Sequence, residues 1–321
     1  MIEIDGSIGE SGGQILRTAL TLSAVTNKPV HIFNIRAKRP NPGLAMQHLT
    51  GAKAVRSICR GELTHAEVGS TELTFTPGKI IGGKYDFNIG TAGSVTLVAQ
   101  TILPILLLAD KKSLIRIIGG THVFKSPGYD YFEHVFLPAI TQMGAQVHSR
   151  LLKVGYYPVG GGEIELEIHP SALKGNTQWI KGEKSEAIIR IGSLPTHVGV
   201  REKKILVENS IEKIRFLEEK TPSPGNSLTV WNGSRGAYAC GEKGKRAEDV
   251  ANEVMSSLTS ALPFDVDERL ADQLLIYAIL AEGTSSYSTP RITQHLQTNK
   301  EIIEKFSQRR IQLDGDKITI E

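Results

Sequence analysis

The sequence is poor in cysteine and in aromatic residues, and it is close to electrical neutrality. Its 321 residues include two cysteines, an aromatic fraction of 6% and a formal net charge of +3. Cys59 and Cys240 lie far apart and lack the spacing of zinc ligands, which excludes a disulfide scaffold and favours a reducing compartment. The small charge permits a nucleic-acid partner but does not indicate one, since strong electrostatic binders are more basic.

Long apolar stretches are also missing. The longest, Val95 to Ala109, is interrupted by Gln100 and Pro104, so it is too short for a membrane span and predicts a buried helix. The first residues contain no basic segment followed by an apolar one, so no secretory leader is expected. The composition, 40% hydrophobic and 22% charged, is that of a globular protein. We therefore expect a cytoplasmic protein without a membrane partner.

A glycine-rich turn stands out near the start of the chain. A short strand leads into the turn 9–13, which carries Glu10, and an amphipathic helix with Arg17 follows. A helix start attracts anions, a carboxylate can hold a divalent cation, and an arginine can hold a phosphate. The turn matches neither a Walker A loop nor the dinucleotide-binding fingerprint. On this segment alone, a tight turn with a solvated glutamate and a phosphate-and-metal corner are equally open.

A weak repeat runs through the chain in order. The first copy is expected to contain a turn at 9–13, helices at 14–25 and 44–58, and a strand at 30–35. The second is expected to contain a turn at 90–93, helices at 94–108 and 129–143, and a strand at 114–118. The third is expected to contain helices at 271–281 and 293–306 and a strand at 285–288. With further strands at 73–75, 163–168 and 317–320, this pattern predicts an α/β fold of pseudo-symmetric repeats.

Between the second and third copies lies a stretch with a complete pattern of its own. Its expected elements are strands at 186–191, 228–231 and 236–240 and helices at 206–217 and 247–262. We therefore expect residues 1–179 to form the first two repeats, 180–265 an inserted small α/β domain, and 266–321 the third repeat. The basic clusters of the insert, 201–204 and 243–246, are typical of solvated faces.

Polar residues that could bind phosphate or react occur at equivalent places in the first and third repeats. Arg36 and Arg39 follow a strand and could form a phosphate cage with Arg17, or an exposed basic loop. Gln47 and His48 start the next helix, where a histidine is more often structural than catalytic. His295 has the corresponding place in the third repeat. A helix start favours the neutral imidazole, which is a competent nucleophile toward phosphorus, although spacing alone still favours a structural role.

Other candidates come from the second and third repeats. Gln100 lies in an apolar helix, and its amide requires partners that are either backbone groups or a ligand base. Pro127 and Tyr131 flank a helix start and could form a wall for a planar ring or belong to the core. Asp272 is either an ordinary acid at a helix start or an acceptor for a hydroxyl group.

Seven short motifs follow one another along the chain, between Ile4 and about Lys305. The first motifs are Gly9-Glu10-x-Gly-Gly-Gln14-Ile-Leu-Arg17, Ile35-Arg36-x-x-Arg39 and Gln47-His48-Leu49. The others are Gly93-Ser94-x-Thr96-Leu97-x-x-Gln100, Gly155-x-x-Pro158-x-Gly160-Gly161-Gly162, Leu270-Ala271-Asp272-Gln273 and His295-Leu296-x-Thr298-Asn299. Each motif is weak alone, but seven in one order are specific, and together they resemble the RNA 3′-terminal phosphate cyclase family. The resemblance implies three repeats of two helices on a four-stranded sheet, with a small α/β domain inserted before the third.

The resemblance also implies an ATP-dependent reaction. A histidine attacks the α-phosphorus of ATP to give a histidine–AMP intermediate, and AMP passes to an RNA 3′-phosphate. The ribose 2′-hydroxyl then closes a 2′,3′-cyclic phosphate. By matching positions, His295 is the nucleophile and Glu10 holds a divalent cation, Mg or Mn. Phosphates of nucleotide or RNA would be bound by Arg17, Arg36, Arg39, Gln47 and His48. The nucleotide pocket would be lined by Gln100, Pro127, Tyr131, Arg269, Leu270, Ala271, Asp272 and Gln273.

Two departures from the family pattern stand out. Bacterial members carry an adenine-stacking aromatic residue where this chain has Arg269, and a guanidinium can also stack on a base. The family's glycine signature, here from Gly155 to Gly162, often begins with a basic residue, and that position is Val154 in this chain. Non-catalytic relatives with an RNA-binding or ribosome-assembly role lack the histidine, which is present here. A sugar or shikimate-type transferase on a related repeat fold would require a different cleft. The partners implied are ATP and RNA with a 3′-phosphate, and a homo-oligomer remains open.

Overall fold

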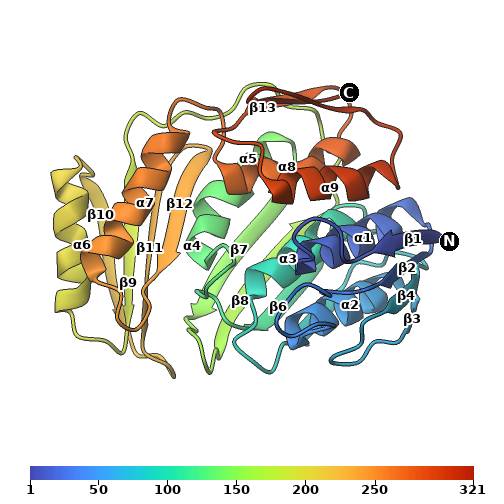
Figure 1. The fold of residues 1–321 in the computed structure, drawn as a ribbon, viewed down its shortest axis with the longest axis horizontal. Coiled ribbons are helices and arrows are strands. Elements are labelled where there is room, and N and C mark those ends of the chain that lie inside the picture. Colours follow the sequence, from blue (N-terminus) through green and yellow to red (C-terminus); the bar gives the residue numbers. More distant parts are fainter.

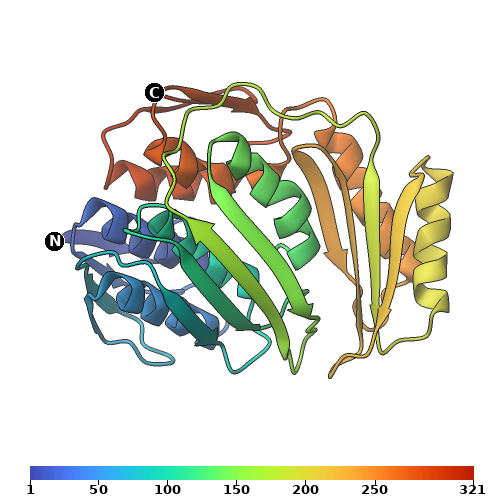
Figure 2. The same ribbon diagram turned by 180° about the vertical axis from the view of Figure 1, so that it is seen from behind.

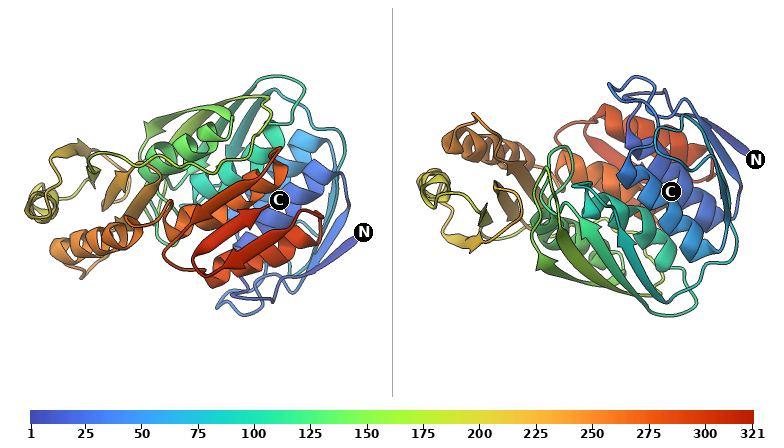
Figure 3. Two further views of the ribbon diagram at one scale, coloured as in Figure 1. Left: turned by 90° about the horizontal axis from the view of Figure 1, so that it is seen from above. Right: turned by 90° about the horizontal axis from the view of Figure 1, so that it is seen from below.

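A computed structural model describes all residues 1–321 as an α/β protein with four small sheets (Figure 1). Three sheets belong to a large body, and the fourth belongs to a smaller unit that stands to one side. In the large body, helices gather in the middle and the sheets lie around them (Figures 2 and 3). The expected fold class is confirmed. None of the helices combines the length and apolar character needed to cross a membrane.

The first repeat is a four-stranded sheet covered by two helices. Its strands pair in the order β1-β2-β4-β3, and β1 and β2 run parallel while the other pairs are antiparallel. Its strands are β1 (Ile2–Asp5), β2 (Val30–Phe33), β3 (Glu62–Thr64) and β4 (Leu73–Thr76), and its helices are α1 (Gly13–Thr26) and α2 (Met46–Cys59). Alternate residues of β2, namely Val30 and Ile32, are buried against the helices, as expected for a sheet with one covered face.

The second repeat has the same topology, with strand order β5-β6-β8-β7 and one parallel pair, β5 and β6. Its strands are β5 (Lys84–Asn88), β6 (Ser113–Gly119), β7 (Gln146–Lys153) and β8 (Gly162–His169). Its helices are α3 (Val95–Leu106) and a second one made of α4 (Tyr129–Tyr131), the π-helical turn η1 (Phe132–Phe136) and α5 (Leu137–Gln142). The apolar run from Val95 is thus a buried helix, as its sequence predicts.

The third repeat contains three regular strands where the family resemblance implies four. Its strands are β13 (Ser285–Ser288), β14 (Ile311–Asp314) and β15 (Lys317–Ile320), in the order β13-β15-β14, and its helices are α8 (Glu268–Leu280) and α9 (Gln294–Glu304). An isolated parallel bridge joins Lys174 to Glu282 beside β13. This short segment occupies the place of the leading parallel strand, and it is too brief to form a regular one.

The smaller unit has the sheet order β10-β9-β11-β12 and its own apolar core. Its elements are β9 (Glu186–Gly192), α6 (His197–Glu208), β10 (Lys213–Glu219), β11 (Gly225–Asn232), β12 (Arg235–Cys240) and α7 (Ala247–Ala261). The helix expected at 206–217 is wrong, because α6 ends at Glu208 and Ser210 adopts φ 63°. After that break, Ile214 and Phe216 alternate with charged residues and pack on the core, which is a strand pattern.

A buried ionic network ties the smaller unit to the second repeat. Arg190 of β9 donates from Nε and Nη2 to the two carboxylate oxygens of Asp130, at 2.7 and 2.9 Å. The ring of His122 lies 3.0 Å from the same carboxylate. Burial alone would raise the pKa of Asp130, but the hydrogen bonds from His122 and Arg190 lower it well below its usual range. The paired charges therefore fix how the two units meet.

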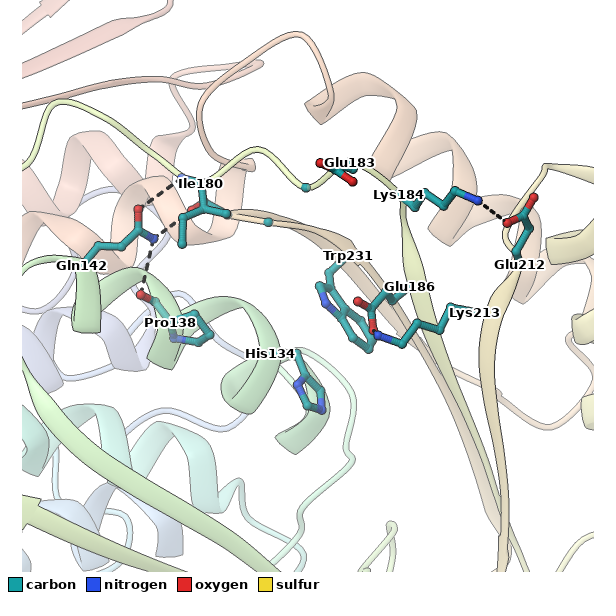
Figure 4. A pocket seen from close by; sticks show the side chains of 13 residues that line it. His134, Pro138, Gln142, Ile180, Glu183, Lys184, Glu186, Glu212, Lys213 and Trp231 are labelled. Carbon is teal, nitrogen blue, oxygen red and sulfur yellow. Dashed lines mark hydrogen bonds and ion pairs between the residues drawn. The ribbon is translucent and has the colours of Figure 1, made fainter.

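A cavity of about 750 Å³ opens between the same two units (Figure 4). Gln142 bridges it at one end, where its Oε1 accepts a hydrogen bond from the Ile180 amide at 3.1 Å. Lys213 pairs with Glu186 at 2.7 Å along the facing wall. None of the residues that the sequence predicts for the active site lines this groove.

Candidate active site

The proposed nucleophile, His295, lies in the first turn of α9, and its side chain is half exposed. Thr293 caps this helix by accepting a hydrogen bond from the Leu296 amide at 3.1 Å, which fixes the turn that carries the histidine. Partial burial lowers the pKa of His295, against the opposing charge of Glu10. The ring is therefore biased toward its neutral form.

Both ring nitrogens of His295 face side chains from the opening segment of the chain. Nδ1 lies 2.9 Å from Oε1 of Gln14, and Nε2 lies 3.0 Å from Oε2 of Glu10. Gln14 in turn donates from Nε2 to Oδ1 of Asp272 at 2.8 Å. Sequence reasoning assigned no role to Gln14. The available signal was its place in the first motif, one helical turn beyond Glu10.

The glycines of the opening turn allow this close approach. Gly9 has φ +51°, and a Cβ there would lie 2.1 Å from Oγ1 of Thr298 on α9. A Cβ on Gly13 would lie 2.2 Å from Nε2 of His48. Glycine is therefore required at both positions, because any side chain would push the turn away from α9 or from α2.

Three arginines gather around this corner. Burial lowers the pKa of Arg17 to about 10, and the nearby Asp272 opposes that shift. Arg39 lies 3.4 Å from Oε2 of Glu10 through Nη2. Arg36 donates to the carbonyl oxygen of Gly43 at 2.7 Å, and repulsion from Arg39 adds to burial in lowering its pKa. The structure thus brings together the three arginines that the sequence singles out.

Gln47 and His48 each accept a hydrogen bond from a backbone amide. Gln47 accepts a hydrogen bond through Oε1 from the Ser94 amide at 3.0 Å, which links the first repeat to the start of α3. The ring of His48 accepts one from the Ala45 amide at 3.1 Å. Burial, followed by the charges of Arg17 and Arg36, lowers the pKa of His48 to about 3. His48 is therefore a neutral donor through Nε2 at physiological pH, not a cation.

A cavity of about 400 Å³ opens in front of His295, and we call it the histidine cavity. Its lining residues come from the opening turn, the start of α8 and the start of α9: Glu10, Glu268, Arg269, Asp272, Arg291, Ile292, Thr293, Gln294 and His295. The volume is in the range of small-molecule sites. Arg269 is exposed on its wall and donates from Nη1 to the Tyr238 carbonyl oxygen at 3.1 Å.

A second, much smaller cavity of about 40 Å³ lies deeper, and we call it the inner cavity. It is lined by Gln14, Arg17, Thr18, Thr21, Gln100, Phe136, Asp272, Gln273, Ile276, Tyr277 and Asn299. Three of its buried polar atoms have no partner within the protein: Nε2 of Gln100, Oε1 of Gln273 and the hydroxyl of Tyr277. Burial raises the pKa of Asp272, which lines both cavities, to about 7. Unpartnered buried polar groups are rare and indicate a bound water or ligand.

Four residues expected at the nucleotide pocket do not reach either cavity. Tyr131 is fully buried, and its hydroxyl donates to Asp267 at 2.7 Å. Leu270 and Ala271 are fully buried in the core of the large body. Pro127 is also buried, and its carbonyl accepts a hydrogen bond from Thr96. Val154, where the family often has a basic residue, is buried as well.

Another group of possible metal ligands lies away from this corner. Asp130, Glu133 and His134 offer ligand atoms close to one another. Both carboxylate oxygens of Asp130 are already bound by Arg190, however. A metal there would have to break the ionic network between the two units.

Comparisons with known proteins identify the family to which this chain belongs. A sequence model of the family "RNA 3′-terminal phosphate cyclase" matches residues 8–313. An RNA 3′-terminal phosphate cyclase of Archaeoglobus fulgidus is 44% identical over 327 residues, covering 100% of both chains. One from Sulfurisphaera tokodaii is 42% identical, covering 99% of this chain and 97% of its own. One from Methanosarcina barkeri is 41% identical, covering 95% and 94%.

The protein is thus an enzyme of the ligase class. The chain belongs to the RNA 3′-terminal phosphate cyclase family, which the ordered motifs of the sequence predict. Among solved structures, the enolpyruvyl transferase NikO from Streptomyces tendae aligns with a TM-score of 0.27 at 11% identity. That match covers 54% of this chain and 33% of NikO and is too weak to carry any argument.

Proposed function

We propose that this enzyme uses ATP to convert the 3′-terminal phosphate of RNA into a 2′,3′-cyclic phosphate through a covalent AMP adduct on His295. The observation that carries the proposal is the position of the His295 ring. Its Nε2 lies 3.0 Å from Oε2 of Glu10 and its Nδ1 lies 2.9 Å from Oε1 of Gln14, and both His295 and Glu10 line the histidine cavity. A neutral imidazole is a nucleophile for phosphorus at the nitrogen that carries the lone pair.

Each step is a substitution at phosphorus. The Nε2 lone pair forms a bond to the α-phosphorus, and the bond to the pyrophosphate oxygen breaks with its electron pair. An oxygen of the RNA 3′-phosphate then attacks the same phosphorus, and the electron pair of the N–P bond returns to Nε2. Finally the 2′-hydroxyl attacks the 3′-phosphorus, loses its proton, and releases AMP. Positioning and charge neutralisation dominate such reactions.

The arginine cluster supports the phosphate part of the proposal. Arg17 is a partly buried guanidinium, and Arg36 and Arg39 bring two further positive charges beside it. Bidentate guanidinium groups match phosphate oxygens in geometry and charge. We assign these three residues to phosphates of ATP or RNA. Gln47 and His48 are further candidates for binding these phosphates, and His48 is close enough to Arg17 and Arg36 for their charges to lower its pKa.

Glu10 fits the role of metal ligand. It is an exposed carboxylate at the mouth of the histidine cavity, and Asp272 is a second carboxylate on the same wall. Mg²⁺ is commonly held by one or two carboxylates together with substrate phosphates and water, and Mn²⁺ accepts similar oxygen ligands. A divalent cation bound by Glu10 would neutralise charge on the phosphates during the first attack.

Unpartnered polar groups support the assignment of a nucleotide pocket. The free Nε2 of Gln100 and Oε1 of Gln273 are a donor and an acceptor, as a base edge requires. Arg269 would pack against the base from the wall of the histidine cavity. Pro127, Tyr131, Leu270 and Ala271 would then support this pocket from the core.

The proposal extends to the organisation of the protein. We propose that residues 180–265 are a domain inserted between parts 1–179 and 266–321 of the repeat domain, which their separate sheet and core support. We also propose a cytoplasmic enzyme, in keeping with two free, buried cysteines.

A labelling experiment tests the proposed chemistry. Incubation with α-labelled ATP and a divalent cation should give an acid-labile protein–AMP adduct, which His295→Ala should lose. A 3′-phosphorylated RNA should then discharge the adduct and acquire a cyclic end. Absence of the adduct in the wild type would overturn the proposal and favour the non-catalytic RNA-binding alternative.

A further inference from the structure

A cavity of about 320 Å³ lies beside the histidine cavity, and we call it the serine cavity. One of its walls comes from α7 of the smaller unit and carries Ser256, Ser257 and Ser260. The opposite wall comes from the start of α8 and from the segment that precedes α9. The smaller unit therefore supplies part of a cavity next to the proposed active site.

The serine cavity and the histidine cavity share a wall. Glu268, Arg269 and Arg291 line both of them. The groove of Figure 4, by contrast, has no lining residue in common with the histidine cavity, and the inner cavity holds only about 40 Å³. A polymer whose end lies at His295 therefore has room to continue into the serine cavity.

The α7 wall of the serine cavity is polar. Ser256 and Ser260 are exposed and lie one helical turn apart, so their hydroxyl groups share one face of the helix. Val254 and Leu258 of the same helix are buried in the core of the smaller unit. A serine hydroxyl can donate to a phosphate oxygen and can accept from a ribose hydroxyl. Such a wall suits a sugar–phosphate backbone.

The opposite wall of the serine cavity is positively charged. Arg291 is 72% exposed and pairs with Glu268 at 2.9 Å, and Arg269 is exposed as well. The remaining carboxylate, that of Asp267, is buried and already accepts hydrogen bonds from three backbone amides. Two guanidinium groups thus face the cavity against one accessible carboxylate, which favours an anionic ligand.

We propose that the serine cavity binds the RNA nucleotide on the 5′ side of the terminal one. This inference rests on the proposed function, in which the terminal 3′-phosphate lies at His295. Arg291 lines both cavities and would hold the phosphate that joins the two nucleotides. The serines would contact the sugar and phosphate beyond it, which positions a strand without reading its sequence. The smaller unit is then part of the RNA-binding surface.

A binding measurement tests the charged wall without any turnover. The probe is a 5′-fluorescent RNA trinucleotide with a 3′-phosphate, and its anisotropy is followed at salt concentrations from about 50 to about 200 mM. Arg291→Gln should weaken binding by about 10-fold. It should also reduce the slope of log affinity against log salt by about 0.7, the value for one phosphate contact on a single strand.

The chain offers a matched control for this variant. Arg150 is also 72% exposed and also pairs with a glutamate, Glu165, but it lies on β7 and lines neither cavity. Arg150→Gln should keep the wild-type affinity and salt slope. An Arg291→Gln protein with the slope and affinity of the Arg150→Gln protein would overturn the proposal.

A blocking variant separates the serine cavity from the histidine cavity. Ser260 lines only the former, so Ser260→Trp should weaken trinucleotide binding several-fold and should weaken binding of a nucleoside 3′-phosphate much less. Thr259→Trp adds the same side chain at an exposed neighbouring position of α7 that does not line the cavity. Equal trinucleotide affinities of the two tryptophan variants would refute the site.

Discharge of a preformed AMP adduct gives a second readout. Ser260→Trp should raise the trinucleotide concentration for half-maximal discharge more than it raises the ATP concentration for half-maximal adduct formation. The reverse result would assign the serine cavity to ATP and overturn the inference. Because the anisotropy measurements require no adduct, a failure of the proposed function remains distinguishable from a failure of this site.

Discussion

Oε2 of Glu10 lies 3.0 Å from Nε2 of His295, although one residue stands near the start of the chain and the other near its end. The contact depends on the packing of α1 against α9 and on the glycine turn that precedes α1. It places the proposed metal ligand at the atom that would attack phosphorus, so substitution of Glu10 should affect the first chemical step directly.

Glu10→Gln should slow adduct formation by about 10–100-fold and raise the divalent-cation concentration required, because the amide is a weaker ligand without a charge. The measurement is a titration of Mg²⁺ or Mn²⁺ at fixed α-labelled ATP. Glu3→Gln serves as control, since Glu3 is an exposed residue that pairs with His31 on β1 and β2. A metal dependence identical to that of the wild type would remove Glu10 from the role of ligand.

Gly9→Ala should destabilise the protein by more than about 1 kcal/mol and reduce adduct formation. Its Cβ would meet Thr298 at 2.1 Å, and its φ of +51° adds backbone strain. Gly69→Ala separates the two causes, because Gly69 has φ +83° but no atom within 4 Å of the added Cβ. Urea unfolding and the labelling assay should show a larger loss for Gly9. Equal losses would mean that the close approach to α9 contributes little.

Breaking the ionic network of Asp130, His122 and Arg190 between the two units should lower the free energy of unfolding. Arg190→Ala leaves the buried Asp130 without its guanidinium partner and should reduce the free energy of unfolding by about 3–5 kcal/mol. Lys184→Ala removes an exposed pair with Glu212 at the groove and should cost less than about 1 kcal/mol. Denaturant unfolding of both variants checks this contrast. Similar midpoints for the two would show that the network does not hold the units together.

Glu202 should make the stability of the protein fall with rising pH. Its side chain is buried, and burial raises its pKa from 4.5 to about 8. The folded protein therefore holds this proton more tightly than the unfolded chain does. The contribution of Glu202 to the free energy of unfolding is constant below pH 4.5. It falls as the pH rises toward about 8 and is constant again above that value.

The effect of Glu202 can be isolated by substitution. Glu202→Gln should flatten the decline, which is at most about 1.4 kcal/mol per pH unit. Glu208→Gln, on the exposed end of the same helix, should leave it unchanged. Urea unfolding between pH 5 and 9 measures both. A wild-type slope retained in Glu202→Gln would contradict the assignment.

The sequence predicted the elements whose patterns are local. The glycine turn, the buried helix from Val95 and the helix start at His295 carry their signals within a few residues. The helix expected across 206–217 failed because α6 ends at Glu208, Ser210 adopts φ 63° and a strand begins at Lys213. The short leading strand at Lys174 pairs with a segment far along the chain, so no local pattern announces it.

The candidate site likewise combines features that the sequence predicted with features that depend on the packing of distant segments. The family resemblance carried by the ordered motifs predicted that Glu10, Arg17 and His295 belong together, and the structure places them around one corner. The link through Gln14 depends on the relative placement of α1, α8 and α9, which periodicity does not encode. The burial of Tyr131 likewise depends on packing, since an aromatic side chain at a helix start suits a ring-binding wall and a core equally.

The pairing of α1 with α9 has a consequence for the timing of biosynthesis. A ribosome releases Glu10, Gln14 and Arg17 early, but their partner His295 only after more than nine-tenths of the 321 residues have been translated. A nascent chain therefore carries the arginine-rich corner for most of its synthesis without His295. Under the proposed function, the AMP adduct could form only after the chain has been extended into its third repeat.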